Sequence, residues 1–486
     1  MKKNYDICVV GNWACINYGA HLTQYALYRY LCDCGYSVLM VEKTDCEPQL
    51  PNTPSLFIDN PYTIDDLCQF YPNLHSMKEL NNIANTFIVG SDQLWVWKLF
   101  WYAMDVYSLS FVNENKRKIS YATSFGNRWT ECTERQRVFL SKMLKRFQRV
   151  SVREKFAEEY CKELFDINAR CVIDPVFLCD KKYYEEMSEK SNLNIQKPYI
   201  FCYVIWPNER IEEMIKELAE KYDLDVICIG DAYHDRLKDW RISLKKNIMV
   251  EDWLYLVRHS EWIVTDSFHA YCFSMIFKKR IIPFGTEACL DRMSSLADQS
   301  GKKKPLTFHD IYSMTNEELF AYYDEKDPGY MLDDFISRSK RWLDDALISN
   351  VEDKVDSFWD EFGTDFIEMR KDRAINNRVI MLEDRKTTKR NVVVFGTGFC
   401  YRRYFMDIES HLGIDYCCDN DSSKWGHLFN EKKCISPKEL SKISNVYVIV
   451  AIDNIDSVAS VKSQLKTYGI TDALGVEEYL SMIRWM

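Results

Sequence analysis

The sequence lacks the features that would mark a membrane, nucleic-acid-binding or secreted protein. No apolar run in its 486 residues approaches the ~20 residues that a membrane-spanning helix needs, and the run after the N-terminal Met-Lys-Lys is too short for a signal peptide. The formal net charge is −10 and no large block of lysine or arginine is present, which argues against a nucleic-acid partner. We therefore expect a cytoplasmic globular protein.

Spacings typical of metal sites and disulfide frameworks are also missing. The 18 cysteines include no C-x-x-C, and the eight histidines form no H-x-x-x-H or H-E-x-x-H pattern. Several thiols, such as Cys8 and Cys202, lie inside apolar runs, where cysteine acts as a small hydrophobe. Neither a metal site nor a disulfide framework is predicted.

Glycine is scarce: only 16 of the 486 residues are glycine, against about 7 % in average proteins. A sequence that avoids glycine should keep it mainly where the backbone requires it. Seven of the sixteen lie at or just past the end of a strand-like run, namely Gly11, Gly90, Gly126, Gly230, Gly285, Gly396 and Gly398. The ends of these runs are where we look for a functional site.

Short apolar runs alternate with longer amphipathic stretches, which predicts parallel sheets covered by helices on both faces. We expect two doubly wound Rossmann-like lobes, residues 1–175 and 176–311. Residues 312–387 are charged and helix-rich, which indicates closing helices and a connector. Residues 388–486 form a third, small Rossmann-like α/β domain.

The main strands are expected at 5–10, 36–42, 86–89, 118–124, 150–153, 199–205, 225–229, 261–264, 280–284, 391–395, 415–419 and 445–450, with a further apolar run at 171–173. The main helices are expected at 20–32, 134–147, 155–165, 209–221, 250–257, 270–277, 335–348 and 352–369. In open parallel sheets, ligands bind outside the carboxyl ends of the strands, so polar residues that follow these strands are the candidates.

The loop after the first strand, residues 11–21, leads into a helix and contains Asn17, Gly19 and His21. A helix N-terminus attracts anions through its free N–H groups and its dipole. The alternative is a tight turn in which Asn17 only caps the helix.

A second polar segment combines Asp92 and Gln93 with two tryptophans, Trp95 and Trp97, just after an apolar run that ends at Gly90. Flat apolar rings beside polar side chains suit the face of a sugar. The alternative is a capped helix whose tryptophans belong to the core.

Two further strand ends carry polar groups. Residues 120–126 are rich in hydroxyls, and Arg153 stands at the end of the run 150–153. An arginine in that position can hold a phosphate or carboxylate through two hydrogen bonds, although a local pair between Arg153 and Glu154 explains the pattern equally well.

The polar run Thr265-Asp266-Ser267-Phe268-His269 follows another predicted strand and opens a helix. A histidine in that position can donate a hydrogen bond to an anion or exchange protons near neutral pH. This segment is the strongest single indication of chemistry in the sequence.

The third domain opens with a strand, the turn Gly396-Thr-Gly398 and a helix, as dinucleotide-binding sites do. Tyr401 stands where the third glycine of that pattern belongs, and Asp419 ends the next strand. A Rossmann-like unit without a bound cofactor explains this pattern nearly as well.

Taken together, these segments resemble the polysaccharide pyruvyltransferase family. The resemblance rests on Asn17-Tyr18-Gly19, Val89-Gly90-Ser91-Asp92-Gln93-x-Trp95, Ser120 to Gly126, Ser151-Val152-Arg153-Glu154, Asp174-Pro175-Val176 and Thr265 to His269, in this order over residues 5–300. Family members more often have glycine after the histidine, where this chain has Ala270. Separately, residues 388–486 resemble a Rossmann-like module that is appended to surface-polysaccharide enzymes.

The resemblance implies a two-lobed fold of the glycosyltransferase B type with its active site between the lobes. It also implies transfer of pyruvate from phosphoenolpyruvate to a sugar of a surface polysaccharide, such as a capsule or exopolysaccharide, or of its precursor, as a cyclic ketal. On this hypothesis, His269, Asp92 and Asp266 supply acid and base catalysis. The donor would contact Arg153, Arg292, Ser267, Asn17 and Gly19, and the acceptor would contact Gln93, Trp95, Trp97 and His21.

The hypothesis requires no metal or other cofactor, because arginine and histidine can neutralise the donor. A lipid-linked oligosaccharide acceptor would bring the enzyme, as a peripheral protein, to the inner face of the membrane or to polysaccharide assembly enzymes. Two alternatives remain open at this stage: a nucleotide-sugar glycosyltransferase of the same architecture, and a non-catalytic scaffold in polysaccharide assembly.

Overall fold

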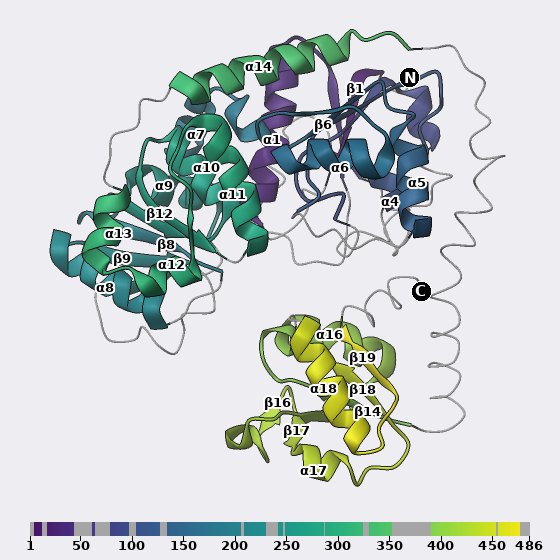
Figure 1. Cartoon of the computed structure of the whole chain (residues 1–486), viewed down its shortest axis with the longest axis vertical. Helices are drawn as coiled ribbons and strands as arrows, with labels where there is room; N and C mark the ends of the chain where they lie inside the picture. Colours follow the sequence, from purple (N-terminus) through teal and green to yellow (C-terminus); the bar gives the residue numbers. More distant parts are fainter. Residues whose placement is uncertain are drawn as a thin grey trace. The chain divides into compact units, whose positions relative to one another are not determined.

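The computed structural model describes residues 4–11, 17–42, 61–63, 78–96, 104–126, 134–205, 209–229, 242–245, 248–285, 287–323, 330–351, 390–452 and 455–476. The chain divides into two compact units, Met1–Asp356 and Ser357–Met486, which are treated separately below (Figure 1).

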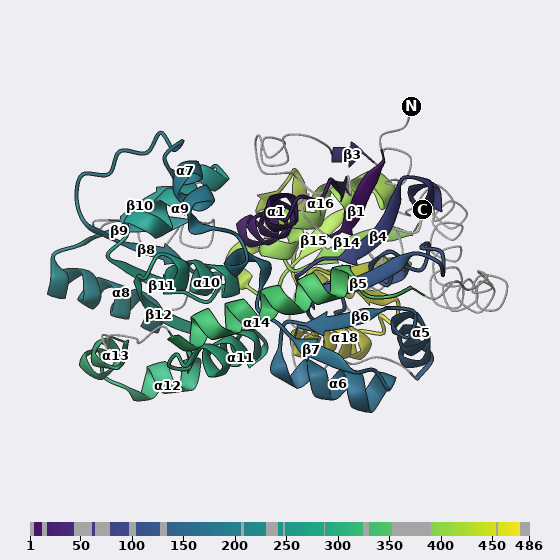
Figure 2. The same cartoon turned by 90° about the horizontal axis from the view of Figure 1, so that it is seen from above.

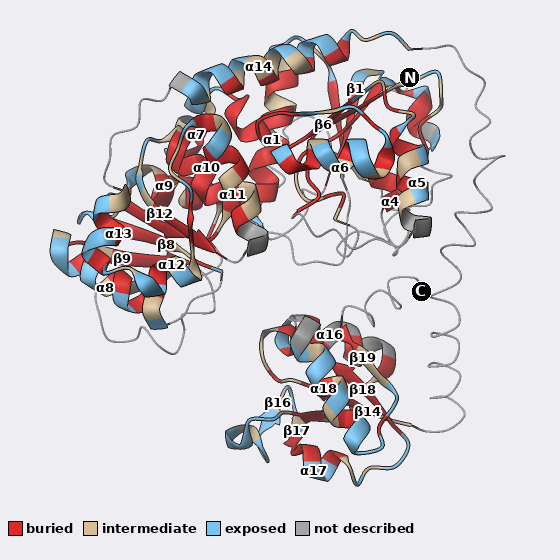
Figure 3. Cartoon of the chain, viewed as in Figure 1, coloured by how far each residue is buried: buried red, intermediate tan, exposed pale blue. Residues whose placement is uncertain are grey.

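The first lobe of the first unit is built on a seven-stranded parallel sheet in the order β3-β2-β1-β4-β5-β6-β7. Its strands are β1 (Tyr5–Val10), β2 (Val38–Glu42), β3 (Pro61–Thr63), β4 (Ala84–Val89), β5 (Arg117–Thr123), β6 (Arg149–Val152) and β7 (Ala169–Cys171). Its helices are α1 (Tyr18–Asp33), η3 (Lys78–Asn82), α4 (Met104–Tyr107), α5 (Glu134–Leu144) and α6 (Lys155–Phe165). The last four residues of β1 and of β4 are all buried, as expected for parallel strands that are covered on both faces (Figure 3).

The second lobe contains a six-stranded sheet in the order β10-β9-β8-β11-β12-β13, parallel throughout. Its strands are β8 (Tyr199–Tyr203), β9 (Asp225–Ile229), β10 (Ile242–Lys245), β11 (Trp262–Thr265), β12 (Arg280–Gly285) and β13 (Leu306–Thr307). Its helical segments are η5 (Pro175–Phe177), α7 (Lys181–Ser188), α8 (Glu209–Tyr222), α9 (Val250–His259), α10 (Phe268–Ile276), α11 (Glu287–Ser300), α12 (Phe308–Ser313) and α13 (Asn316–Tyr323).

The two lobes share one hydrophobic core. Side chains alternate along β8, so that Tyr199 and Phe201 join the core shared with the first lobe, whereas Ile200 and Cys202 join a second core under α8. From the first lobe, β1 and α1 contribute Val9 and other residues to the shared core. The lobes therefore meet through packed side chains.

Helix α14 (Tyr330–Leu347) packs against α11 of the second lobe and reaches β5 of the first (Figure 2). The ring centroids of Trp342 and Tyr121 lie 6.2 Å apart, and the hydroxyl of Ser339 accepts a hydrogen bond from the backbone N–H of Ile173 at 2.9 Å. These contacts fix the end of β7 and the residues that follow it.

The second unit is a small doubly wound domain with sheet order β16-β17-β15-β14-β18-β19. Its strands are β14 (Asn391–Phe395), β15 (Tyr416–Cys418), β16 (Leu428–Phe429), β17 (Lys432–Ile435), β18 (Val446–Val450) and β19 (Ala473–Gly475). Its helical segments are α16 (Phe399–Leu412), η6 (Ser422–Lys424), α17 (Pro437–Leu440) and α18 (Ile455–Thr467). Val392 and Val394 of β14 pack into one core, whereas Val393 and Phe395 pack into another on the opposite face of the sheet.

The predicted fold class is confirmed: two doubly wound lobes and a third Rossmann-like domain. The bounds of α6, β9 and β14 match the predicted ranges, whereas α1 begins at Tyr18, two residues early, because Asn17 caps it. Elements not among those predicted include β3, β10, β13 and α7, of which the strands are too short or too polar to show a period. The helix predicted at 352–369 lies outside the described residues.

Candidate active site

Polar side chains that follow three strands of the first sheet, β4, β6 and β7, gather at its carboxyl edge. Asp92 follows β4, Arg153 and Glu154 follow β6, and Asp174 follows β7. From the second lobe, His269 of α10 reaches the same place, because α1 and α10 pack together there. The carboxyl edge of a parallel sheet is where such folds bind ligands.

Asp174 is the centre of this cluster and is buried. Its Oδ1 accepts hydrogen bonds from the Thr23 hydroxyl at 2.8 Å and from the Val176 N–H at 3.1 Å. Its Oδ2 accepts a hydrogen bond from Arg153 Nη1 at 2.9 Å and lies 3.7 Å from His269 Nε2. Burial alone would raise the pKa of Asp174, but His269 and Arg153 hold it well below its ordinary value, so Asp174 stays ionised.

Arg153 is almost fully buried among carboxylates. Besides Asp174, its Nε contacts Glu154 Oε1 at 3.2 Å, and its Nη2 lies 3.7 Å from Asp92 Oδ1. Burial alone would lower its pKa, but these three carboxylates raise it above the ordinary value, so the guanidinium is charged at any working pH. Within the described residues, Nη2 has no hydrogen-bond partner although it is buried, which leaves one donor of the guanidinium available.

Glu154 is completely buried. Its Oε1 accepts a 2.6 Å hydrogen bond from the Ser124 hydroxyl in addition to the contact with Arg153. Its Oε2 forms no hydrogen bond to any described residue. Burial raises the pKa of Glu154 by more than Arg153, Ser124 and Arg292 lower it.

His269 lies in the first turn of α10, against Gly19 of α1. A Cβ atom added to Gly19 would come within 2.1 Å of His269 Nδ1, so only glycine leaves room for the imidazole there. His269 Nε2 is buried without a hydrogen-bond partner among the described residues, 3.7 Å from Asp174. The imidazole ring therefore lies between Gly19 of α1 on one side and the carboxylate of Asp174 on the other.

The backbone at the end of β4 and β5 is irregular in a way that aims these side chains. Asp92 has a φ of 93°, a backbone conformation that residues other than glycine rarely adopt. A β-bulge interrupts the pairing of β5 with β6, and the hydroxyls of Ser120 and Ser151 satisfy its backbone groups. Ser124 lies beyond the bulge, and its hydroxyl donates to Glu154.

Arg292 of α11 supplies a second guanidinium. Its Cζ lies 5.8 Å from the centre of the Phe268 ring, and Cζ of Arg153 lies 4.3 Å from the same centre. Arg292 Nε is buried without a hydrogen-bond partner among the described residues. Both predicted anion-binding arginines therefore lie beside one aromatic ring, next to His269.

Of the predicted site residues, the structure brings together Asp92, Arg153, Arg292, His269 and Gly19. Other predicted residues form hydrogen bonds within the fold. Asn17 caps α1 by accepting hydrogen bonds from Gly19 N–H and Ala20 N–H, which is the alternative that the sequence allowed. Asp266 accepts a 2.7 Å hydrogen bond from the Ile205 N–H and so ties the end of β11 to that of β8.

Trp95, predicted to bind a sugar face, is enclosed in the core, which is the alternative that the sequence allowed. The side chain is fully buried, its Nε1–H donates to the Tyr107 carbonyl at 3.0 Å, and its ring packs on Phe125 and Phe147. The predicted acceptor residue His21 is likewise fully buried.

Three other predicted residues are less constrained. Gln93 is partly exposed beside Gly126. Ser267 is partly exposed at the N-cap of α10, where its hydroxyl forms no capping hydrogen bond. Trp97 lies outside the described residues.

Sequence reasoning assigned no role to Asp174 and treated Glu154 only as a local partner of Arg153. Asp174 belongs to the motif Asp174-Pro175-Val176, in which Pro175 opens a 3-10 helix and the Asp174 side chain caps it. The sequence motif was visible, but a helix-capping aspartate explains it as well as a functional residue does. Its partners Thr23, Ser91 and His269 are all more than 60 residues away in the sequence.

Family models show to which proteins the chain is similar in sequence. Residues 17–287, more than half of the chain, match the family described as polysaccharide pyruvyl transferase. The chain belongs to the polysaccharide pyruvyl transferase family. Residues 388–473 match a second model, described as C2185-like, N-terminal. A search of curated proteins gave no match.

Solved structures give distant similarities to this pyruvyl transferase family member. The UDP-GlcNAc 2-epimerase of Methanocaldococcus jannaschii is 14 % identical with a TM-score of 0.45, over 70 % of this chain and 99 % of that one. The enzyme of that name from Neisseria meningitidis is 14 % identical with a TM-score of 0.45, over 71 % and 99 %. Arabidopsis thaliana UGT89C1 is 9 % identical with a TM-score of 0.37, over 76 % and 100 %. The fold assignment rests on the strand order of the chain itself: two doubly wound lobes, as in the glycosyltransferase B type.

The C-terminal domain uses its glycine-rich turn internally. Asp419 Oδ2 accepts hydrogen bonds from the N–H and hydroxyl of Thr397 and lies 3.0 Å from Lys424 Nζ, so this carboxylate holds the turn itself. Tyr401, at the third glycine position, is buried and donates to the Phe429 carbonyl at 2.9 Å. The residues that would bind a dinucleotide are thus already occupied or replaced.

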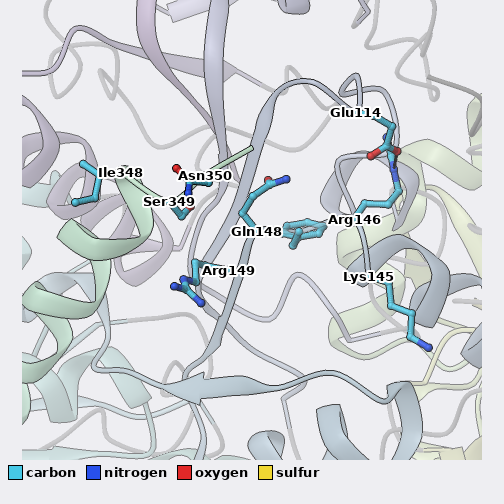
Figure 4. Close-up of a pocket in the computed structure, with 9 residues that line it drawn as sticks. Glu114, Lys145, Arg146, Gln148, Arg149, Ile348, Ser349 and Asn350 are labelled. Atoms are coloured by element: carbon cyan, nitrogen blue, oxygen red, sulfur yellow. Dashed lines mark hydrogen bonds and ion pairs between the residues drawn. The ribbon is translucent and has the colours of Figure 1, made fainter. Parts of the chain in front are cut away.

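A cavity of about 560 Å³ lies at the opposite, amino-terminal edge of the first sheet (Figure 4). It is lined by Glu114, Lys145, Arg146, Phe147, Gln148, Arg149, Ile348, Ser349 and Asn350. Its buried cation, Arg146, is bound by Glu114 and by the Val112 carbonyl, so its charge is already neutralised. We therefore do not assign the catalytic function to this cavity.

In the described ranges, no helix is both long and apolar enough to cross a membrane. Nor do three or more His, Cys, Asp or Glu side chains gather there in a way that could hold a metal ion.

Proposed function

We propose that this chain transfers pyruvate from phosphoenolpyruvate to two hydroxyls of a sugar, in a surface polysaccharide or its precursor, as a cyclic ketal. The observation that carries the proposal is the grouping of Arg153, Arg292 and His269 around Phe268 and Asp174. Each of the three has a buried nitrogen without a hydrogen-bond partner in the described residues. Buried polar atoms without a hydrogen-bond partner are rare, and a bound ligand can supply the missing hydrogen bond.

The donor carries a phosphate and a carboxylate, and two guanidinium groups suit these two anions. Arg153 would bind one of them through its Nη2, and Arg292 would bind the other through its Nε. The phosphate would also be near the N–H groups that open α10. Asp174 cannot move away from Arg153, because Thr23 and the Val176 N–H hold its other oxygen.

The chemistry requires an acid and a base. Protonation of the methylene carbon of phosphoenolpyruvate produces a cationic carbon, to which the first sugar hydroxyl adds. The carbon–oxygen bond to phosphate then breaks, the second hydroxyl closes the ketal, and inorganic phosphate leaves with the remaining proton. We assign His269 as the acid, oriented by Asp174, and Asp92, partly exposed next to Arg153, as the base.

The acceptor would lie over the exposed edge of this cluster, beside Gln93 and Ser267. A lipid-linked acceptor would bring the enzyme to the inner surface of the membrane.

The test is release of inorganic phosphate from phosphoenolpyruvate by the purified chain with a panel of sugar acceptors, together with mass spectrometry of the products. We expect phosphate release that depends on the acceptor, and a product heavier than the acceptor by one ketal-linked pyruvate. Binding should be compared by thermal shift with phosphoenolpyruvate and with nucleotide sugars. Stabilisation by nucleotide sugars alone would contradict the proposal and favour a glycosyltransferase.

A further inference from the structure

Carboxyl groups offset the guanidinium groups of the candidate site, so the site is less favourable to an anionic donor than the two arginines alone would make it. Two guanidinium groups, Arg153 and Arg292, lie in the described part of the site, together with three carboxyl groups, Asp92, Glu154 and Asp174. Arg153 is shared among all three of these carboxyls. If all three carboxyl groups are ionised, the charge of Arg153 is already neutralised when a donor with a phosphate and a carboxylate enters the site.

One of the three carboxyls differs from the others. Asp174 receives four hydrogen bonds, from Thr23, Val176, Ser91 and Arg153. Asp92 is partly exposed to water. Glu154 is fully buried, and its Oε2 has no hydrogen-bond donor among the described residues to stabilise a negative charge. Glu154 is therefore the group that gains most from becoming neutral.

We propose that Glu154 takes up a proton from solvent when the anionic donor binds, so that Arg153 exchanges one carboxylate partner for the donor. The proton goes to Oε2, the oxygen without a hydrogen bond, while Oε1 keeps its hydrogen bond from Ser124. Glu154 then acts as a positioning residue: it neutralises Arg153 in the empty site and releases its charge to the ligand. This inference rests on the proposed donor.

The groups that face Glu154 support this assignment. From α11, the positive charge of Arg292 acts on Glu154, and binding of an anion there would screen that charge. From β7, the Cys171 thiol is buried next to Glu154 and its pKa is raised, so it stays neutral. From β5, Ser124 is an uncharged donor. His269 interacts with Asp174, which makes it the other group that could take up a proton.

The experiment is calorimetric titration of the full chain with phosphoenolpyruvate at pH 7.5, in two buffers with different ionisation enthalpies. A phosphate ester is almost fully ionised at this pH, so the ligand contributes little. We expect the wild type to take up about 0.5–1 proton per donor bound, and its affinity to fall up to tenfold per pH unit above neutrality. Glu154→Gln should bind the donor with little or no uptake and with a flat pH profile.

Two variants separate the sources of the proton. Glu158→Gln changes a carboxylate in the first turn of α6, just after Glu154, that accepts a hydrogen bond from the Cys171 N–H, and it should keep the wild-type uptake. His269→Asn should also retain most of it. If uptake disappears in His269→Asn but persists in Glu154→Gln, or if wild-type binding involves no uptake, the inference is wrong. Absence of phosphoenolpyruvate binding by the wild type would instead overturn the proposed function, and this inference with it.

Discussion

Gly19 and His269 lie in contact across the two lobes, so close that a Cβ atom on Gly19 would stand 2.1 Å from the imidazole Nδ1. The two residues are 250 positions apart, in helices that open at the carboxyl edges of different sheets. This contact sets where the imidazole stands relative to Asp174, and it links the packing of the lobes to the position of the proposed acid.

Gly19→Ala should therefore impair activity more than it impairs folding. The added methyl group would displace His269 from Asp174, so we expect acceptor-dependent phosphate release to fall by about tenfold or more, since misplacement by 1 Å alone can cost about 100-fold. The melting temperature should change by only a few degrees. Gly398→Ala is the matched control, because an added Cβ meets open space there. Unchanged turnover in Gly19→Ala would show that the contact does not matter.

His269→Ala should reduce turnover by about 10²–10⁴-fold, the range expected for loss of an acid–base group. Asp174 and Arg153 would keep their hydrogen bond, so donor binding should be affected less than the maximum rate. Initial rates of phosphate release at several donor concentrations measure both. His259→Ala, in the partly exposed last turn of α9, serves as the control. A variant with near wild-type turnover would remove His269 from the mechanism.

Arg153→Met should destabilise the first unit. Its side chain is 2 % exposed and faces three carboxylates, so its loss leaves buried charges without a partner. We expect the free energy of unfolding to fall by about 3–5 kcal/mol in chemical denaturation. Arg338→Met removes a pair with Asp334 in which the side chains are 40 % and 64 % exposed, and should cost under about 0.5 kcal/mol. Equal losses of unfolding free energy in the two variants would contradict a stabilising role for the buried ion pairs of Arg153.

Trp95→Phe distinguishes a core residue from an acceptor-binding one. Removal of the indole leaves the Tyr107 carbonyl without its donor and opens a small cavity, so we expect about 1–3 kcal/mol of destabilisation. The KM for the acceptor should change less than about twofold, because a fully buried ring cannot touch a bound sugar. Trp425→Phe, at a partly exposed ring of the C-terminal domain, should change neither quantity appreciably. A selective rise in the acceptor KM of Trp95→Phe would support the prediction that this residue binds the sugar.

Local patterns in the sequence were sufficient for the elements and their order. Buried parallel strands produce continuous apolar runs and amphipathic helices produce a period of 3.6 residues, both of which depend on neighbouring residues alone. The same holds for the strand-terminal glycines and for Arg153 and His269, which follow strands and so had to lie at the carboxyl edges.

The partners of those residues depended on the tertiary structure. Sequence alone determined that the chain is doubly wound and which polar segments end its strands. Packing of the two lobes decided that Asp174 meets His269. Packing within each lobe decided that Asp266 binds the Ile205 N–H just after β8, and that Trp95 is enclosed by Phe125 and Phe147. The physical reason is that burial and ion pairing depend on residues distant in the sequence, so a polar strand end or a tryptophan has the same local pattern in a site as in a core.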